Sequence, residues 1–215
     1  MKKPFPRKYV FIIGLIIGLV VSGGVFSMTG FSIFGNPHHN PSTQTNINNA
    51  ELTALAFNVL EYIRDDDFVA LSNVVHPDFG LVFSPGATIN LSTNRRFSAE
   101  QVSAFEADPT VYLWGVHRCL GIPIELTAVE YFSEYVFSRN YIDAPVIGID
   151  RIVRSGNALE NIKDEFPGVR FVDFHIPGDK NGSADHLDWS SLRLGFEMHE
   201  DQLWLTVIVH STWTV

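Results

Sequence analysis

The closing stretch 189–213 constrains the fold most strongly. Two long runs of aromatic and β-branched residues alternate with polar residues on either side of the acidic pair Glu200–Asp201. Runs with a period of two on either side of a tight turn predict an antiparallel β-hairpin. If Glu200 and Asp201 form the turn, His199 pairs with Gln202. All the remaining cross-strand pairs are then fixed by counting outward from the turn. The chain is therefore expected to contain a sheet built around two long neighbouring strands.

This register divides the hairpin into an apolar face and a mixed face. Because a fully solvated face rarely carries two tryptophans, we interpret the mixed face as a ligand pocket, a partner surface or a second packed layer. The apolar face, expected to be buried, carries Leu192, Leu194, Phe196 and Met198 opposite Val209, Val207, Leu205 and Leu203. The mixed face pairs Arg193 with Ile208, Ser191 with His210, Glu197 with Trp204, and Trp189 with Thr212.

The candidate ligand-binding residues all lie on that mixed face. They are Arg193, His210, Trp189 and Trp204. Two of them have a purely structural alternative, since Arg193 can form an ion pair with Glu197 and His210 can be a buried, hydrogen-bonded histidine. The sequence leaves both interpretations open.

A second candidate site lies in the predicted strand 168–176. Asp173 and His175 are two residues apart and therefore share one face of that strand. A carboxylate can orient an imidazole for general base catalysis, although the same pair can be a structural hydrogen bond at a strand end. With His210, these residues are the candidates for a catalytic base. The sequence contains no familiar nucleophile, phosphate-binding or zinc motif, so we predict no metal site and no cofactor.

Helical patterns precede the long strands. Residues 52–63 place apolar side chains at helical spacing, and 65–75 has the pattern of a second short helix. Capping boxes at Ser98–Gln101, Thr127–Glu130 and Asn157–Glu160 predict three more helices, the last running to Phe166. Further strands are expected at 111–116, 168–176, 190–198 and 203–213. We therefore predict an α+β fold with helices packed on one face of a curved antiparallel sheet.

The first fifty residues predict a location. Residues 9–34 carry no charge over 26 positions, more than the roughly 20 apolar residues that cross a bilayer. The basic tip 1–8 precedes them, so the positive-inside rule places the tip in the cytoplasm and the rest of the chain outside. We expect a single-pass signal anchor at 9–34 in the cell membrane. The alternative is a signal peptide that is cleaved near Ser22–Gly24 and releases a secreted protein.

Residues 35–49 are polar, contain proline and are nearly uncharged, as is typical of a flexible linker. This leaves 50–215 as an extracytoplasmic α+β domain. All 24 acidic residues lie from Glu51 onward, against 11 lysines and arginines, which gives that part a formal charge of −13. Such a surface repels nucleic acid, which we exclude as a partner. The single cysteine, Cys119, excludes an intrachain disulfide and a multi-cysteine metal site.

Several short strings within 50–215 resemble an uncharacterised family of bacterial extracytoplasmic proteins, many of them lipoprotein-like or signal-anchored. They are HPDFGLVFSP, PIELTAVEYFSEYVF, APVIG, SGNALENI, FHIPG, DWSSLRLGFE and IVHSTWT. The resemblance implies an extracytoplasmic domain and brings no established activity or catalytic residue. This chain lacks a lipobox cysteine, which favours a helical anchor over a lipid one. The order of helices and strands is also similar to the NTF2-like cone fold, an analogy that assigns no function.

The first hypothesis is a membrane-tethered extracytoplasmic binding or interaction domain. Its partner would be a cell-envelope component or a small ligand, with the membrane bound through the N-terminal helix. One alternative is a small-molecule enzyme of the NTF2-like kind that uses a His or Asp base. The other is a structural domain that assembles through its mixed sheet face, and the sequence leaves the oligomeric state open.

Overall fold

The structure, a computed structural model, describes residues 48–117, 120–179 and 187–213. These residues belong to the second of two compact units, Thr43–Val215, into which the chain divides. The segments 1–8, 9–34 and 35–47, to which the cytoplasmic tip, the anchor and most of the linker were assigned, lie outside the described residues. Within the described ranges, no helix combines the length and the apolar character needed to cross a bilayer.

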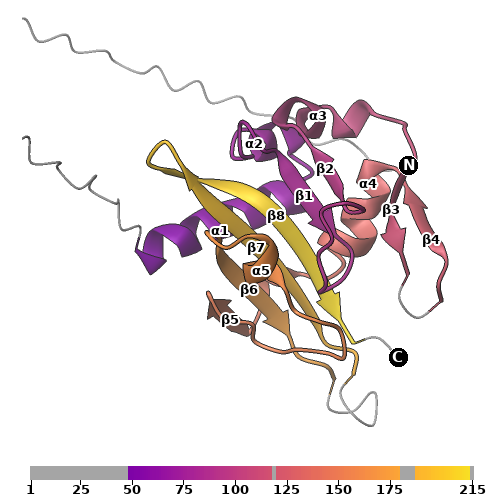
Figure 1. The fold of residues 1–215 in the computed structure, drawn as a ribbon, viewed down its shortest axis with the longest axis vertical. Helices are drawn as coiled ribbons and strands as arrows, with labels where there is room; N and C mark the ends of the chain where they lie inside the picture. The colour runs from indigo at the N-terminus through magenta and orange to yellow at the C-terminus, as the bar shows by residue number, and fades with distance from the viewer. Residues whose placement is uncertain (1–47, 118–119, 180–186, 214–215) are drawn as a thin grey trace, which may run out of the picture. The chain divides into compact units, whose positions relative to one another are not determined.

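The described chain is a mixture of short helices and strands, with a long curved hairpin running across it (Figure 1). The helical elements are α1 (Asn49–Arg64), α2 (Phe68–Ser72), α3 (Ala99–Ser103), η1 (Phe105–Ala107), α4 (Ala128–Tyr131), the π-helix η2 (Phe132–Val136), η3 (Tyr141–Asp143) and α5 (Ile162–Glu165). The strands are β1 (Leu81–Ser84), β2 (Arg95–Phe97), β3 (Tyr112–Val116), β4 (Pro123–Leu126), β5 (Val146–Ile149), β6 (Arg170–Ile176), β7 (Ser190–His199) and β8 (Gln202–Thr212).

Capping chemistry fixes where most helices begin. The boxes at Ser98 and Thr127 are both present, which confirms the predicted starts of α3 and α4. The first helix is capped by Asn48 with Glu51, so it begins within the predicted linker rather than after it. The predicted helix starting at Asn157 is wrong, since α5 begins only at Ile162. The Glu160 side chain, which the predicted box would have used, instead binds an arginine on β7.

The main sheet has six strands in the order β2-β1-β8-β7-β6-β5. Neighbouring strands are antiparallel except β1 and β8, which are parallel, so the sheet is mixed where an antiparallel one was predicted. Strands β3 and β4 form a separate antiparallel pair. The predicted α+β class with a curved sheet is confirmed (Figure 1). The helices do not all lie on one face as predicted, because Ile162 of α5 packs in a second cluster with Val207 and Val209.

The β7–β8 hairpin follows the predicted register only over its first four pairs. From the turn, the pairing runs as expected from His199–Gln202 to Phe196–Leu205. Gly195 then pairs with Val207, so Thr206 is an extra residue in β8. Such a β-bulge moves every later residue of the bulged strand to the opposite face. The predicted pairs beyond Phe196 are therefore wrong by one position.

This bulge separates Arg193 from His210, which the sequence had placed on one face. Arg193 now pairs with Val209, and Leu192 pairs with His210. His210 therefore shares a face with Leu192, whereas Arg193 shares the opposite face with Val207 and Val209. The bulge itself is tightly packed, because a Cβ on Gly195 would lie 2.5 Å from a methyl carbon of Val207.

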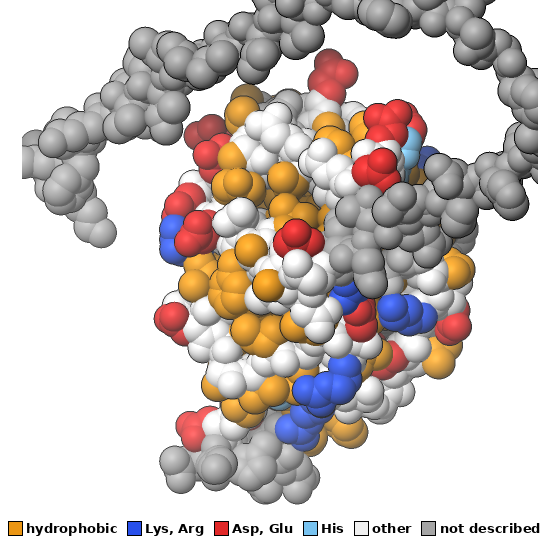
Figure 2. Space-filling view, turned by 90° about the vertical axis from the view of Figure 1, so that its left-hand side faces the viewer, with side chains coloured by type: hydrophobic (Ala, Val, Ile, Leu, Met, Phe, Trp, Pro, Cys, Tyr) orange, Lys and Arg blue, Asp and Glu red, His pale blue; other side chains and the backbone are white. Residues whose placement is uncertain are grey.

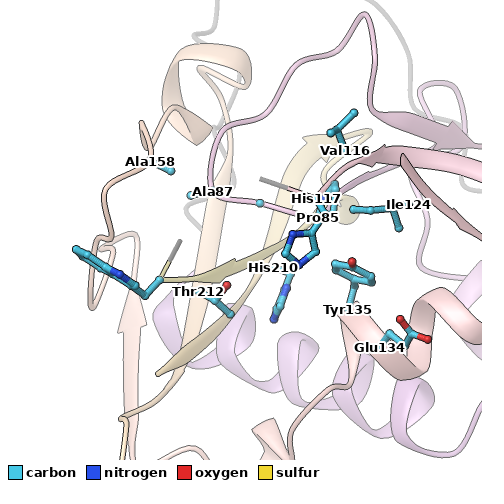
Figure 3. Close-up of a pocket in the computed structure, with 12 residues that line it drawn as sticks. Pro85, Ala87, Val116, His117, Ile124, Glu134, Tyr135, Ala158, His210 and Thr212 are labelled. Carbon is cyan, nitrogen blue, oxygen red and sulfur yellow. The ribbon is translucent and has the colours of Figure 1, made fainter. Parts of the chain in front are cut away.

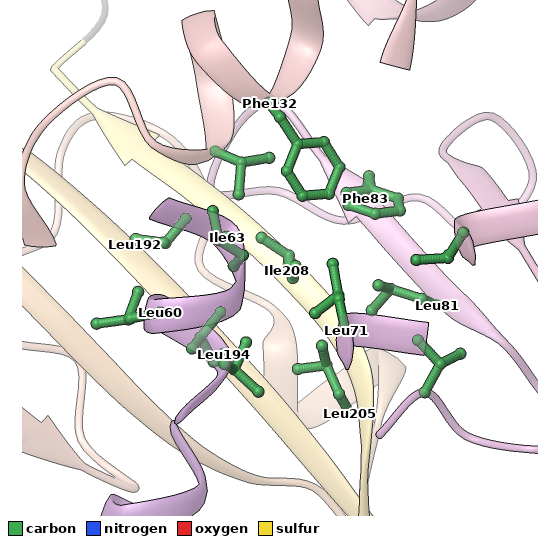
Figure 4. Packing of buried hydrophobic residues seen from close by; sticks show 14 of the residues in the cluster. Leu60, Ile63, Leu71, Leu81, Phe83, Phe132, Leu192, Leu194, Leu205 and Ile208 are labelled. Atoms are coloured by element: carbon green, nitrogen blue, oxygen red, sulfur yellow. The ribbon is translucent and has the colours of Figure 1, made fainter. Parts of the chain in front are cut away.

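The two faces of the sheet have different covers. The helix face carries Leu192, Leu194 and Ile208 and is buried against α1, α2 and η2 (Figure 4). The strap face is covered by residues 150–169, a segment we call the strap, which includes α5. Its smaller cluster contains Val82, Ile89, Ile162, Phe166, Val169, Phe171, Val207 and Val209. Strand β1 contributes to both clusters, because Phe83 belongs to the one on the helix face and Val82 to the one on the strap face.

The surface reflects the acidic composition. On the face seen in Figure 2, acidic side chains are spread around an apolar area, together with several basic side chains. This distribution agrees with the excess of acidic residues after Glu51.

Candidate functional site

A cavity of about 290 Å³ opens on the helix face, at the C-terminal end of β8. Its volume is close to the lower limit for pockets that hold small organic molecules. The lining comes from β8, η2, the β3–β4 pair, the loop after β1 and one strap residue. The lining residues are Pro85, Gly86, Ala87, Val116, His117, Ile124, Glu134, Tyr135, Ala158, His210, Thr212 and Trp213.

His210 is anchored in this cavity through one ring nitrogen. Its Nε2 lies 3.2 Å from the Ser190 hydroxyl and 3.4 Å from the Ser138 hydroxyl. The Tyr141 hydroxyl joins both serines, at 2.5 Å from Ser190 and 3.2 Å from Ser138. Because three hydroxyl groups can supply the protons of this network, Nε2 is suited to accept, which leaves the imidazole proton on Nδ1.

The surroundings keep His210 uncharged at neutral pH. Burial, reinforced by the positive charge of Arg139, lowers the pKa of His210 to about 4. Removing water from around an imidazolium disfavours its charge, and a nearby cation adds to that effect. The cavity therefore presents a neutral imidazole that can donate or accept a hydrogen bond.

Among the described residues, three ring nitrogens of the lining have no hydrogen-bond partner. Across the part of the chain that the structure describes, Nδ1 of His210 makes no hydrogen bond. Nδ1 of His117 and Nε1 of Trp213 are buried and also lack one. Leaving a buried donor or acceptor unpaired costs about 1–3 kcal/mol. Nδ1 of His210 is not among the buried atoms, so it is the ring nitrogen that a molecule in the cavity can reach.

Aromatic rings complete one wall of the cavity. In Figure 3 the rings of His210, His117 and Tyr135 surround the same space, and Glu134 lies to one side on η2. Tyr135 meets His210 edge-on at a centroid distance of 5.9 Å and stacks at 5.2 Å on Tyr131, which is buried. Burial and the Glu134 charge raise the pKa of Tyr135, so its phenol stays protonated.

The opposite, strap face holds a buried cluster of charges. The guanidinium of Arg193, fully buried, binds both carboxylate oxygens of Glu160 in the strap. Its Nε lies 3.2 Å from Asp173 on β6, and Asp173 also accepts from the backbone N–H of Val153 at 2.8 Å. Glu197, the predicted partner of Arg193, is therefore not the residue that neutralises it. The cluster fixes the strap to the sheet.

The other candidates of the strap face are also tied to structure. His175 and Asp173 share a face as predicted, but Nδ1 of His175 lies 2.9 Å from the Ser191 hydroxyl. Burial lowers the pKa of His175, and the Asp173 charge only partly opposes this. Trp189 is buried, with Arg154 over its ring at 5.4 Å and Gly156 close to its edge. The strap thus covers the surface that was expected to bind a ligand.

The structure therefore divides the four predicted ligand-binding residues. His210 lines the cavity, whereas Arg193 and Trp189 lie buried on the opposite face. Trp204 lies near the turn of the hairpin, where its Nε1 donates to the His199 carbonyl at 3.2 Å. None of the cavities described for these residue ranges is lined by Arg193, Asp173 or Trp189.

Sequence reasoning missed His117, Tyr135 and Trp213 as members of the site. They come from the β3–β4 pair, from η2 and from the residue after β8, and no spacing rule joins these segments. Only Trp213 gave a signal in the sequence, because an indole at the end of a predicted strand is a candidate for lining a pocket. Among the described residues, no cluster of three His, Cys, Asp or Glu side chains is arranged to hold a metal.

No family model matches the chain, and no curated protein matches it. Solved structures do. An NTF2-like protein of unknown function from Pseudomonas putida matches at 8% identity, covering 75% of this chain and 84% of its own, with a TM-score of 0.29. The β subunit of a benzoate 1,2-dioxygenase from Burkholderia mallei matches at 11% identity, over 78% and 91% of the two chains, with a TM-score of 0.33.

A third match, from Xanthomonas campestris, is described as a candidate calcium/calmodulin-dependent protein kinase II association domain. It has 15% identity over 77% of this chain and 89% of its own, with a TM-score of 0.31. Because the scores of all three structures lie below 0.5, we base the α+β assignment on the helices and sheet of this chain. The activities of these proteins do not transfer to it.

Proposed function

We propose that the domain binds a small uncharged ligand in the cavity around His210. The observation that carries this proposal is the open Nδ1 of His210 beside the cavity, with the buried, unpaired ring nitrogens of His117 and Trp213 in the same lining. A concave, partly enclosed space with a few unsatisfied polar groups is a common form of small-molecule site. A ligand could form its hydrogen bond there without breaking any hydrogen bond of the protein.

The low pKa of His210 favours a role in binding over a role as a general base. An effective general base has a pKa close to the working pH. The pKa of His210 is near 4, so at neutral pH it has little affinity for the proton it would have to take. His175 also has a lowered pKa and lies in the packed strap face, away from the cavity.

An assembly role through the mixed sheet face has less support than binding. Trp189 is 1% exposed and lies beneath the strap, so it is not available to a second copy. Trp204 is partly exposed, but it lies near the hairpin turn and its indole is already bonded.

We further propose that this binding domain is tethered outside the cytoplasmic membrane. The support is the uncharged stretch 9–34, the basic tip before it, and the resemblance of 50–215 to bacterial extracytoplasmic proteins. The test uses Cys119→Ser with Glu200→Cys at the exposed hairpin turn, expressed in bacterial cells. A membrane-impermeant maleimide should label intact cells as fully as lysed cells. Labelling only after lysis would refute the location.

The binding proposal is tested by NMR of the full chain in lipid nanodiscs, with the histidine rings labelled with ¹⁵N. Butanamide is a suitable first probe, because its amide both donates and accepts hydrogen bonds. It should shift the ring resonances of His210 and His117 and leave those of His199 unchanged. The His210→Ala chain identifies the signals. If millimolar butanamide shifts neither cavity histidine, the proposal is wrong.

A further inference from the structure

We propose that the ligand is an uncharged amphiphile, with its polar head in the His210 cavity and an unbranched apolar tail in the groove beside it. The inference rests on the proposed function, because it assigns a chemical class to the ligand of the same site. It arises from a second hollow that adjoins the first and differs from it in chemistry.

The groove has a volume of about 440 Å³ and lies between the loop after β1 and strand β3. Its lining combines the apolar Pro85, Leu113 and Val116 with uncharged polar side chains, namely Ser84, Thr88, Asn90, Thr93 and Asn94. None of its lining residues is charged. Such a surface suits a hydrocarbon chain and offers no partner to an ionised group.

The groove and the His210 cavity are neighbours. Three residues, Pro85, Gly86 and Val116, line both of them. In Figure 3, Val116 and Pro85 lie above the His210 ring, on the side of the β3 strand. The two walls approach each other closely at Gly115 of β3, where an added Cβ would lie 3.1 Å from the Pro85 ring. A single molecule can therefore extend from one hollow into the other.

Exposed apolar side chains in the groove would favour binding of the tail. Leu113 is 45% exposed and Val116 is 53% exposed, on a strand whose Trp114 is fully buried. Strand β3 is held in place at this point by Arg95, whose Nε donates to the Leu113 carbonyl at 2.9 Å. A tail laid against Leu113 and Val116 would remove their surface from water, which stabilises the complex roughly in proportion to the area covered.

The charges around the head position favour a neutral group. His210 is uncharged, and the Arg139 that lowers its pKa is cationic. Glu134, an anion, lines the same cavity and is exposed. With one charge of each sign near the head, neither a carboxylate nor an ammonium is selected. An amide, alcohol or ester head can hydrogen-bond to Nδ1 of His210 at no ionic cost.

The experiment measures the affinity of the full chain in lipid nanodiscs for butanamide, hexanamide and octanamide. The three compounds share the amide head and differ only in chain length, so differences in affinity report the contribution of the tail. The His210→Ala chain in the same nanodiscs gives the background from partition into lipid. Affinity above that background should rise with each added methylene, by up to about fourfold.

Two variants locate the tail. Leu113→Gln alters the groove without touching the His210 cavity and should remove most of the dependence on chain length, while butanamide binds as before. Val69→Gln changes a comparably exposed side chain on α2, 62% exposed, and should leave the whole series unchanged.

The outcomes separate the two proposals. If butanamide binds and octanamide binds no more tightly, the cavity is a site but the amphiphile is wrong. If none of the amides binds above background, the proposed function fails first. A dependence on chain length that survives Leu113→Gln would place the tail elsewhere and overturn the assignment of the groove.

Discussion

The two faces of the β7–β8 hairpin use polar residues in opposite ways. On the strap face, Arg193 is surrounded by the carboxylates of Glu160 and Asp173, so its charge is neutralised within the protein. On the helix face, His210 is held at Nε2 and leaves Nδ1 open beside a cavity. The first arrangement closes a surface, and the second leaves hydrogen-bonding capacity for another molecule. A buried polar residue is thus a candidate for binding when part of its capacity is unused and reachable.

The largest expected effect comes from breaking the strap cluster. Arg193→Ala leaves Glu160 and Asp173 as unpaired charges in a buried environment, and removing one partner of such a cluster typically costs about 3–5 kcal/mol. Urea unfolding should show a loss of that size. Arg64→Ala, which removes an exposed ion pair with Asp65, is the matched control and should leave the midpoint unchanged. A small loss in Arg193→Ala would show that the strap is held by other contacts.

The pH dependence of stability should report on the helix face. The folded pKa of His210, about 4, is below its value in an unfolded chain, about 6.5. The unfolded state therefore binds the proton more readily, so this contribution is complete above pH 6.5 and is lost as the pH falls toward 4. The loss amounts to roughly 3 kcal/mol.

The comparison that isolates this effect is with His210→Asn, which cannot titrate. The difference in unfolding free energy between the two chains should change between pH 7 and pH 4.5, with the native chain losing more. Parallel curves for both chains would mean that His210 is solvated and titrates normally.

The bulge that separates the faces should tolerate no added atom at Gly195. An alanine there would bring its Cβ to 2.5 Å from a methyl of Val207 and 3.0 Å from one of Val169. Overpacking of this kind costs about 1–3 kcal/mol. Gly168→Ala, whose Cβ would meet only the Glu197 carboxylate at 3.7 Å, is the control. Equal midpoints for the two variants would contradict the tight packing at the bulge.

The smallest effect is expected from Tyr141→Phe. It removes the hydroxyl that joins Ser190 to Ser138 and leaves the ring in place. The two lost hydrogen bonds, one buried and one partly buried, together cost about 1–2 kcal/mol. Because Ser190 keeps its contact with His210, butanamide should still bind. Loss of binding without loss of stability would assign Tyr141 a direct role in holding the ligand.

The sequence predicted the elements of the fold better than the site. Periodicity and capping boxes located α1, α3, α4 and the long strands, because these signals depend on residues close together in the chain. The start of α5 was misjudged because a long-range contact decides it, as Glu160 binds Arg193 rather than capping a helix. Local patterns carry no information about such a contact.

The site was misjudged for a related reason. One extra residue, Thr206, moves His210 to the other face of the sheet, and alternation alone cannot show where a strand is interrupted. The sequence named His210 as a candidate and the structure places it beside a cavity, but its predicted neighbours Arg193 and Trp189 lie on the opposite face. Its real neighbours, His117 and Tyr135, come from elements that only the folded chain brings together.

The most direct test of this account is an NMR titration of the His210 ring in the full chain, with and without butanamide. We predict a pKa near 4, a proton on Nδ1 and a shift of the Nδ1 resonance when the amide is added. An ordinary histidine pKa near 6.5, with no response to the amide, would show that His210 is an exposed side chain and that the cavity is not a binding site.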